Sequence, residues 1–163
     1  MIERTLVLLK PDAVERGISG EIIHRFERVG LKIVGMKMAW VDNKFAEKHY
    51  DEDLAKRRGA NVRQWNVDFL SSGPVIAMAI EGVNAIENTR SLVGNTEPKS
   101  ALPGTIRGDF SHVSYEYCDA KACVLKNTIH ASADKKDAEK ELKLWFKASE
   151  LFDYQAVHEK HTR

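Results

Sequence analysis

The run from Val75 to Ile80 is apolar nearly throughout, and this feature constrains the fold most. A strand that is apolar nearly throughout is typical of the centre of a sheet, so we expect this strand to be central. Residues 3–10 also form the pattern of a buried strand, which Pro11 closes. Strands alternating with helices predict a layered α/β sandwich. The pattern predicts strands at 3–10, 31–41, 75–80 and 121–129, helices at 19–29, 43–50, 61–71, 84–92 and 134–147, and mostly irregular chain at 94–120.

Length and composition fit one compact domain over residues 1–163, with 43% hydrophobic and 30% charged residues. A net charge of +1 provides no general affinity for nucleic acid or acidic lipid, so any affinity for phosphates must come from a local cluster. Two cysteines do not make a disulfide framework, and no apolar run reaches membrane-spanning length. The N-terminus leads into a strand without a secretory segment. We therefore expect a cytoplasmic enzyme that does not bind or span a membrane.

A histidine and an acid near the C-terminus are candidates for nucleophilic chemistry. Ala138, Leu142 and Trp145 define the buried stripe of the last predicted helix, and Glu141 points to the same side. A carboxylate on an apolar face is costly unless it is paired, and His130 is a reasonable partner. Such a pair would orient the imidazole and stabilise its cationic form, as a histidine nucleophile requires. The alternative is a partly exposed glutamate beside a core histidine.

Basic and hydroxyl side chains in separate parts of the chain suit a phosphate-rich ligand. Arginine forks match phosphate oxygens in two-point contacts, and lysine adds a point charge. Lys10 ends the first predicted strand, and Arg107 lies in a loop rich in proline and glycine. The set also contains Tyr50, Arg90 and Thr96.

Six short motifs follow one another between Glu3 and about Tyr154. They are Leu9-Lys10-Pro11-Asp12, the stretch 16–23, His49-Tyr50, Ser72-Gly73-Pro74-Val75, the stretch 103–110, and Asn127-Thr128-Ile129-His130-Ala131-Ser132. In these motifs and their order the chain resembles the nucleoside diphosphate kinases. The resemblance implies a ferredoxin-like four-stranded antiparallel sheet covered by helices. It also implies transfer of the γ-phosphoryl group from a nucleoside triphosphate to a nucleoside diphosphate, by a ping-pong mechanism through a phosphohistidine on His130.

The resemblance implies a role for each matched residue. His130 is the nucleophile, Glu141 orients it, and Ser132 hydrogen-bonds near it. Lys10 and Asn127 meet the sugar hydroxyl, and Lys10 also lies near the transferred phosphate. The remaining contacts implied are Arg90, Thr96 and Arg107 with the phosphates, Tyr50 near the γ-phosphate, and Val124 in the base pocket.

Each of these residues also has a purely structural explanation. Arg90 could belong to a solvated helix face, and Tyr50 could serve helix packing only. Lys10 could be an exposed strand-end lysine. Ser132 and Asn127 could be cap or turn formers. The residues lie far apart in sequence, so their joint agreement with one phosphate site favours the functional interpretation.

The segment 53–65 departs from the family pattern, because it lacks the usual Pro-Phe-Phe element whose first phenylalanine stacks on the nucleobase. Val62 or Trp65 could do the stacking.

Residues 111–123 form an insertion that would lengthen the loop before the last strand. The insertion contains potential metal ligands, but tetrahedral zinc needs tighter pairs and a fourth ligand, so they suggest a metal site only weakly. These ligands are His112, Cys118 and Cys123.

A further departure affects magnesium. The family often has an acid at the position of Ala133, and that acid is thought to reach the nucleotide's Mg²⁺ through water. In this chain the nearest acid, Asp134, is displaced by one position. Mg²⁺ would still arrive with the nucleotide's phosphates.

The expected partners are nucleoside triphosphates and diphosphates. Nothing in the motifs resembles a reader of base edges, so purines and pyrimidines should be accepted alike. The resemblance implies a homo-oligomer, a hexamer or a tetramer, usually stabilised through the loop around residues 94–110. Two alternatives are a catalytically weak nucleotide-binding regulatory relative and a nucleic-acid-binding protein. The near-zero net charge and the lack of a Lys/Arg stripe argue against nucleic acid as the main partner.

Overall fold

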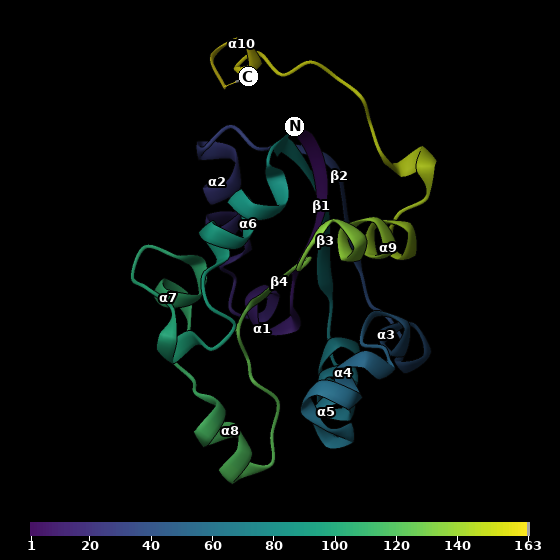
Figure 1. Cartoon of the computed structure of the whole chain (residues 1–163), viewed down its shortest axis with the longest axis vertical. Coiled ribbons are helices and arrows are strands. Elements are labelled where there is room, and N and C mark those ends of the chain that lie inside the picture. The colour runs from purple at the N-terminus through teal and green to yellow at the C-terminus, as the bar shows by residue number, and fades with distance from the viewer. Residues whose placement is uncertain (163) are drawn as a thin grey trace.

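The computed structural model describes residues 1–162, and its centre is a four-stranded sheet (Figure 1). The strands are β1 (Ile2–Leu9), β2 (Lys32–Ala39), β3 (Val75–Val83) and β4 (Ile129–Ala131), in the order β2-β3-β1-β4. Every neighbouring pair is antiparallel. The prediction of a ferredoxin-like antiparallel sheet is confirmed, and β3 is central, as its apolar sequence indicates.

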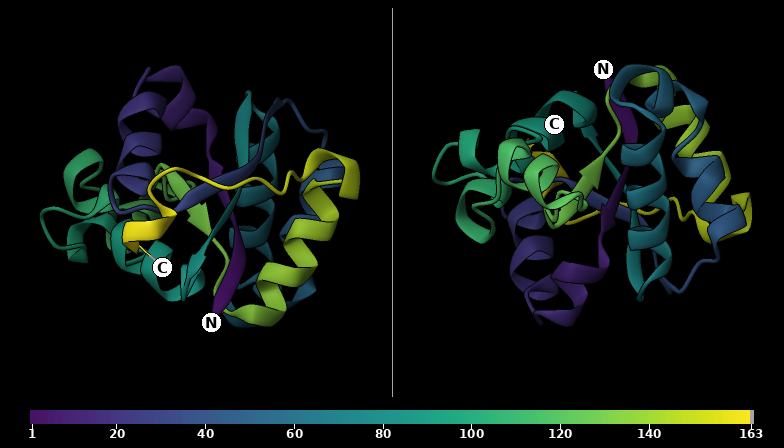
Figure 2. Two further views of the ribbon diagram at one scale, coloured as in Figure 1. Left: turned by 90° about the horizontal axis from the view of Figure 1, so that it is seen from above. Right: turned by 90° about the horizontal axis from the view of Figure 1, so that it is seen from below.

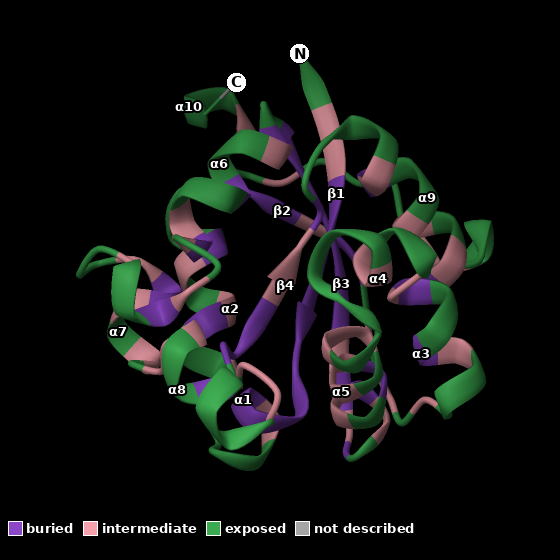
Figure 3. Ribbon diagram, turned by 60° about the horizontal axis from the view of Figure 1, so that its bottom comes forward, coloured by how far each residue is buried: buried purple, intermediate pink, exposed green. Residues whose placement is uncertain are grey.

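Helices cover both faces of this sheet (Figure 2). Along β1, Val7 and Leu9 belong to one apolar cluster, whereas Leu6 and Leu8 belong to the other, because successive side chains of a strand point to opposite faces. Figure 3 shows buried strands between helices whose outer faces are exposed. The helices in the segments for which the sequence predicts them are α2 (Ser19–Arg28), α3 (Asn43–His49), α5 (Ala60–Ser71), α6 (Ala85–Val93) and α9 (Lys135–Trp145).

Two helices, α3 and α9, begin at the side-chain caps that the sequence predicts. The carboxylate of Asp42 accepts the N–H of Phe45 at 2.8 Å and begins α3. The carboxylate of Asp134 accepts the N–H of Asp137 at 2.9 Å and begins α9. The position of α9 therefore follows from local chemistry.

Several short helices occupy segments for which no helix is predicted. Thr105 and Ser114 each cap one of them, at 3.1 Å and 3.2 Å from an amide nitrogen. The prediction of mostly irregular chain at 94–120 is therefore wrong, because it overlooks these hydroxyl caps. The additional elements are α1 (Pro11–Glu15), α4 (Glu52–Arg58), η1 (Pro98–Ser100), α7 (Ile106–Phe110), α8 (Tyr115–Lys121), η2 (Ala148–Glu150) and α10 (Glu159–Thr162).

The last strand is much shorter than predicted. The expected strand at 121–129 is wrong, because only Ile129–Ala131 pairs with β1. Thr128 has a φ of 64°, which turns the chain away from an extended path immediately before Ile129. The apolar run before this turn leads from α8 toward the sheet instead of extending it.

After α9 the chain passes along the outer edge of the sheet. The N–H of Phe152 donates to the carbonyl of Val34 on β2 at 2.7 Å. In the described part of the chain, no helix has the length and apolar character needed to cross a membrane. The opposite edge, formed by β4, holds the residues considered next.

Candidate active site

A strained turn places the candidate nucleophile. Thr128 is a β-branched residue with positive φ, a conformation that costs free energy and is common at functional sites. Its N–H donates to Oδ2 of Asp12 at 3.0 Å, and the N–H of Ile129 donates to the carbonyl of Asn127 at 2.7 Å. These bonds hold the turn, and β4 then places His130 opposite Leu8 of β1.

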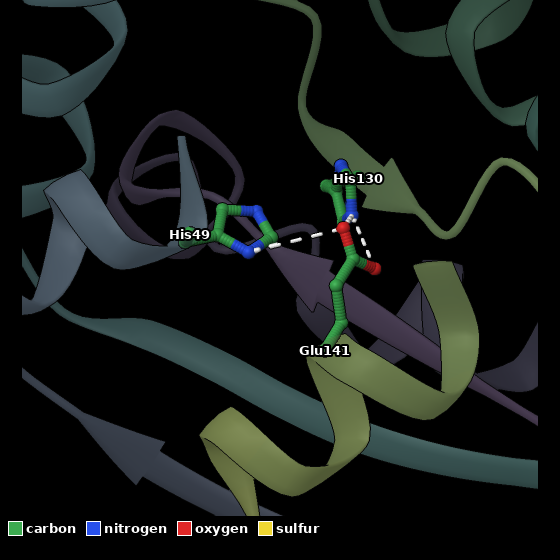
Figure 4. A group of neighbouring side chains, drawn as sticks. All are labelled: His49, His130 and Glu141. Carbon is green, nitrogen blue, oxygen red and sulfur yellow. Dashed lines mark hydrogen bonds and ion pairs between the residues drawn. The ribbon is translucent and has the colours of Figure 1, made fainter. Parts of the chain in front are cut away.

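His130 and Glu141 form the contact that the sequence predicts (Figure 4). Nε2 of His130 lies 3.0 Å from each carboxylate oxygen of Glu141. The hydroxyl of Ser132 donates to Oε2 of Glu141 at 2.6 Å, and it accepts the N–H of Leu6 at 3.3 Å. Glu141 thus orients one nitrogen of His130, and the sheet itself fixes Ser132 behind the carboxylate.

The electrostatics keep Glu141 ionised. Burial acts to raise the pKa of this carboxyl, but the charge and hydrogen bond of His130, helped by Ser132, lower it to about 2. Because Nε2 of His130 faces the carboxylate, Nδ1 is the nitrogen that points away from Glu141 (Figure 4). The imidazole side chain is 21% exposed, so a ligand in the adjoining cavity can reach it.

His49 belongs to the same group, although the sequence assigned it no role. Its ring meets that of His130 edge to face with centroids 4.5 Å apart, and its Nδ1 lies 4.0 Å from Oε1 of Glu141. The indole N–H of Trp145 donates to this Nδ1 at 3.4 Å. Burial, with the charge of His130, lowers the pKa of His49 to about 3 and keeps the ring neutral. His49 follows Ala46 by three residues and therefore lies on the same, buried side of α3; this spacing could have predicted its burial.

Lys10 is buried at the end of β1 and is not an exposed strand-end lysine. Its Nζ donates to Oδ1 of Asn127 at 2.7 Å, and Nδ2 of Asn127 donates to the carbonyl of Thr96 at 2.8 Å. Burial and the nearby charge of Arg107 lower the pKa of Lys10 to about 8, against the opposing effect of Asp12. Lys10 therefore retains a proton that it can lose in the neutral to mildly alkaline range.

Arg107 is buried and locked by main-chain carbonyls. Its guanidinium donates to the carbonyls of Asn127, Gly94 and Ile129 at 3.3, 3.2 and 2.6 Å. Burial lowers its pKa to about 10, so it remains charged at neutral pH. A charged group that is fixed before a ligand arrives loses little conformational freedom when the ligand binds.

A cavity of about 660 Å³ brings the predicted residues together. Ser132 is the one predicted site residue that does not line it, since it supports Glu141 from behind. Both Val62 and Trp65 reach the cavity, so either can contact a base. The predicted residues that line it are Lys10, Tyr50, Arg90, Thr96, Arg107, Val124, Asn127, His130 and Glu141.

The inserted segment 111–123 forms one wall of the cavity, a role that the sequence pattern did not predict. α8 lies on one side of β4, and α4 and α5 lie on the other (Figure 1 and Figure 3). Tyr115, Cys118 and Cys123 line the cavity from the α8 side. The guanidinium carbon of Arg58, at the end of α4, lies 4.1 Å from the centroid of the Tyr115 ring. The segment 111–123 therefore forms one wall of the cavity, although α8 extends away from the sheet (Figure 1).

The donors of a possible metal site are His49, His130 and Glu141, whose ligand atoms lie within 4.8 Å of one another. Their hydrogen bonds to Trp145 and Ser132 account for the arrangement without an ion. His112 does not join Cys118 and Cys123 in a ligand group within residues 1–162.

The comparisons with known proteins identify the family of the chain. The family model described as nucleoside diphosphate kinase matches residues 3–151. A nucleoside diphosphate kinase of Borreliella burgdorferi is 47% identical, over 94% of this chain and 93% of its own length. One from Pyrococcus horikoshii is 51% identical, over 93% of this chain and 90% of its own length.

Solved structures give the same result. A nucleoside-diphosphate kinase from Borrelia burgdorferi, described as a transition state mimic with bound vanadate and ADP, superposes with a TM-score of 0.97. It is 45% identical, and the match covers 99% of this chain and 96% of that one. An enzyme from Halobacterium salinarum in complex with CDP has a TM-score of 0.86 at 36% identity, covering 100% and 99% of the two chains. By sequence and by structure, this chain belongs to the nucleoside diphosphate kinase family.

Proposed function

We propose that this chain moves the γ-phosphoryl group of a nucleoside triphosphate to a nucleoside diphosphate through a phosphohistidine on Nδ1 of His130. The observation that carries the proposal is the pairing of Nε2 of His130 with both oxygens of Glu141, which leaves Nδ1 directed away from the carboxylate. A histidine with one nitrogen fixed by an acid presents the lone pair of the other to an electrophile.

In the first half-reaction the Nδ1 lone pair of His130 forms a bond to the γ-phosphorus, and the bond from phosphorus to the β–γ bridging oxygen breaks. The electron pair leaves with the nucleoside diphosphate. The imidazole becomes more positive, and the ionised Glu141, whose pKa is about 2, stabilises that charge through Nε2–H. In the second half-reaction a β-phosphate oxygen of another diphosphate attacks the phosphorus, and the electron pair of the N–P bond returns to Nδ1.

Three cationic side chains of the cavity suit the phosphates. Phosphoryl transfer depends mainly on in-line positioning and on neutralising charge. Lys10 and Arg107 are buried and fixed by hydrogen bonds, whereas Arg90 is exposed on α6 and free to follow the ligand. Tyr50 provides a hydroxyl that stays protonated, because burial raises its pKa.

Magnesium fits the site through Asp137. Mg²⁺ prefers oxygen ligands and retains several waters. Asp134 uses its carboxylate to cap α9, whereas Asp137 lines the cavity. Burial and the negative charges of Asp134 and Glu141 raise the pKa of Asp137, and a cation would relieve this unfavourable environment. Asp137 would hold Mg²⁺ through one of its waters, in place of the acid missing at Ala133, and the ion would supply positive charge to the phosphates.

Broad base specificity is expected because the residues proposed to contact the base are apolar. Val62, Trp65 and Val124 offer apolar surface to a base, and stacking on such surface depends little on base identity. Purine and pyrimidine nucleotides are therefore expected as substrates.

A cytoplasmic location is consistent with the free thiols of both cysteines.

Assembly into a homo-oligomer, a hexamer or a tetramer, is supported by an apolar surface along the edge strand β2. Met36 and Met38 on β2 and Trp40 directly after it are 47%, 62% and 69% exposed, and they follow one another at every second position. Contiguous exposed apolar side chains on an edge strand mark an interaction surface.

The single-domain organisation of residues 1–163, with its insertion at 111–123, is part of the same proposal.

The test is the intact mass after brief exposure to ATP with Mg²⁺. We expect one added phosphoryl group that is labile to acid, is lost on addition of GDP, CDP or dTDP, and does not form in His130→Ala. His24→Ala, at an exposed histidine of α2, is the matched control and should be phosphorylated like the parent protein. Nucleotide binding without any phosphoryl adduct would instead assign the chain to a catalytically weak regulatory role.

A further inference from the structure

Cys118 lies in the last turn of α8 and Cys123 two residues after its end, and both line the proposed nucleotide cavity. Both are free thiols. Cys118 is 4% exposed, and Cys123 is half-buried. Neither takes part in the phosphoryl transfer proposed above, so the reaction leaves two nucleophilic side chains beside the substrate without a role.

The end of α8 holds the two cysteines against each other. Ala122 has a left-handed conformation, with φ 47° and ψ 52°, and the N–H of Cys123 donates to the carbonyl of Cys118 at 3.0 Å. This is the hydrogen-bond pattern of a Schellman motif, in which the side chains of those two residues often contact each other. In agreement, burial and the direct interaction with Cys123 raise the pKa of the Cys118 thiol to about 11.

A disulfide needs Cα atoms within about 7 Å and side chains that face each other. The main-chain hydrogen bond holds the backbones of Cys118 and Cys123 close together, and the two thiols interact directly, so the pair suits this requirement. We propose that Cys118 and Cys123 form a redox-active thiol pair, which a peroxide converts into a disulfide in the wall of the nucleotide cavity.

The chemistry balances with one peroxide for each pair of thiols. The Cys123 thiolate attacks one oxygen of hydrogen peroxide, the O–O bond breaks, and Cys123 becomes a sulfenic acid; the hydroxide released takes up the proton that the Cys123 thiol lost and becomes water. The Cys118 sulfur then attacks the Cys123 sulfur, the S–O bond breaks, and the hydroxide leaves as a second water with the Cys118 proton. Two thiols and one peroxide therefore give one disulfide and two waters.

Exposure determines which thiol reacts first. Cys123 is half-buried and lines the cavity, so a small oxidant can reach it. Cys118 is almost closed to solvent, and its raised pKa makes its thiolate scarce. Cys118 is therefore the resolving thiol.

The disulfide would alter the base side of the cavity. The Cys118 thiol donates a weak hydrogen bond to the carbonyl of Val124 at 3.6 Å, and Val124 lines the cavity. Oxidation removes this donor and draws the sulfurs to about 2.05 Å, so Cys123 and Val124 must move toward α8. His130 is held separately by β4 and Glu141. We therefore expect a higher KM for nucleotides and little change in kcat, an effect that rests on the proposed function, whereas the thiol chemistry does not.

The first experiment treats the whole reduced protein with dilute hydrogen peroxide and digests it with trypsin. Lys121 lies between the two cysteines, so cleavage separates the peptide 108–121 from the peptide 122–126. We expect these peptides to remain joined after oxidation and to separate after reduction with dithiothreitol. Oxygen added at the exposed Met36 or Met38 falls in other peptides and does not interfere.

Single variants test the order of reaction. Cys118→Ser should stop at a sulfenic acid on Cys123 that a dimedone probe traps. Cys123→Ser should react much more slowly, because the remaining thiol is buried. Oxygen added to both cysteines of the parent protein without a link between the peptides would overturn the proposal.

Nucleotide protection tests the location of the pair. Saturating ADP, with binding confirmed by calorimetry, should slow formation of the link several-fold. The linked protein should show a KM raised several-fold that dithiothreitol restores, whereas Cys118→Ser/Cys123→Ser should have the same KM before and after peroxide. Link formation at an equal rate with and without bound ADP, or an unchanged KM in the linked enzyme, would contradict the coupling. Failure of ADP to bind at all would count against the proposed function instead.

Discussion

His49 and His130 meet edge to face with ring centroids 4.5 Å apart, and the carboxylate of Glu141 faces both rings. The two histidines differ in environment, because His49 is buried and neutral with a pKa of about 3, whereas the His130 side chain is 21% exposed. A neutral His49 leaves the charge of Glu141 available to His130 alone. One histidine therefore supports the orientation of the other.

Replacing His49 should lower the rate of the chemical step more than it changes nucleotide affinity. We expect His49→Gln to reduce kcat about tenfold, equivalent to about 1.4 kcal/mol, with KM nearly unchanged, because it removes the ring that packs against His130. His49→Phe should lose less, since it keeps an aromatic edge. Single-turnover phosphorylation by ATP is the measurement, with His24→Gln as the control. A larger loss in the Phe variant than in the Gln variant would assign the effect to the hydrogen bond from Trp145.

Replacing Glu141 should slow phosphorylation of His130. Glu141→Gln keeps the shape but removes the charge that stabilises the positive imidazole, so we expect a loss of about 100-fold, or about 2.7 kcal/mol. Glu139→Gln, at an exposed position of the same helix, should have no effect. Rates are measured by quenched-flow phosphorylation with both variants at equal occupancy by ATP. Equal rates for the two variants would show that Glu141 only packs.

The pH dependence of kcat/KM should have an alkaline limb set by Lys10. Its pKa in the free protein is about 8, so the ammonium group is lost as the pH rises through 8 and nucleotide binding weakens above it. Bound phosphates favour the charged form, so the limb in kcat should lie at higher pH. In Lys10→Gln we expect a lower kcat/KM without this limb. An identical limb in the variant would assign it to another group.

Replacing Asp12 should destabilise the turn that precedes His130. Asp12→Ala removes the acceptor of the buried Thr128 N–H, and we expect a loss of about 1–3 kcal/mol in the free energy of unfolding. Asp12→Asn retains an acceptor oxygen and should lose less. Urea denaturation followed by fluorescence measures both, and equal losses would show that the negative charge, not the hydrogen bond, stabilises the turn.

Replacing Asp137 should increase the need for magnesium. Asp137→Asn removes the carboxylate proposed to hold a magnesium-bound water, so the Mg²⁺ concentration that gives half-maximal phosphorylation should rise several-fold. The rate at saturating Mg²⁺ should change less. Glu139→Gln is the control, and an unchanged magnesium requirement in Asp137→Asn would exclude Asp137 from this role.

The sequence by itself determined the features that depend on local spacing. Helical periodicity and the Asp134 cap located α9, and they placed Glu141 on the side where it meets His130. The apolar run in β3 indicated a central strand. The ordered motifs indicated the family and the residues that line the cavity. These features could be predicted because each depends on neighbouring residues or on a pattern repeated along the chain.

The tertiary structure decided what depends on distant contacts. The turn at Thr128 is held by Asp12, 116 residues away, so the shortness of β4 could not be derived from its own residues. The burial of His49 results from the meeting of α3, α9 and the sheet. The role of α8 as a cavity wall, with Cys118 beside Cys123, depends on where the insertion folds. Local hydrogen bonds and periodicity are encoded in short segments, whereas burial and charge environment exist only after distant segments pack together.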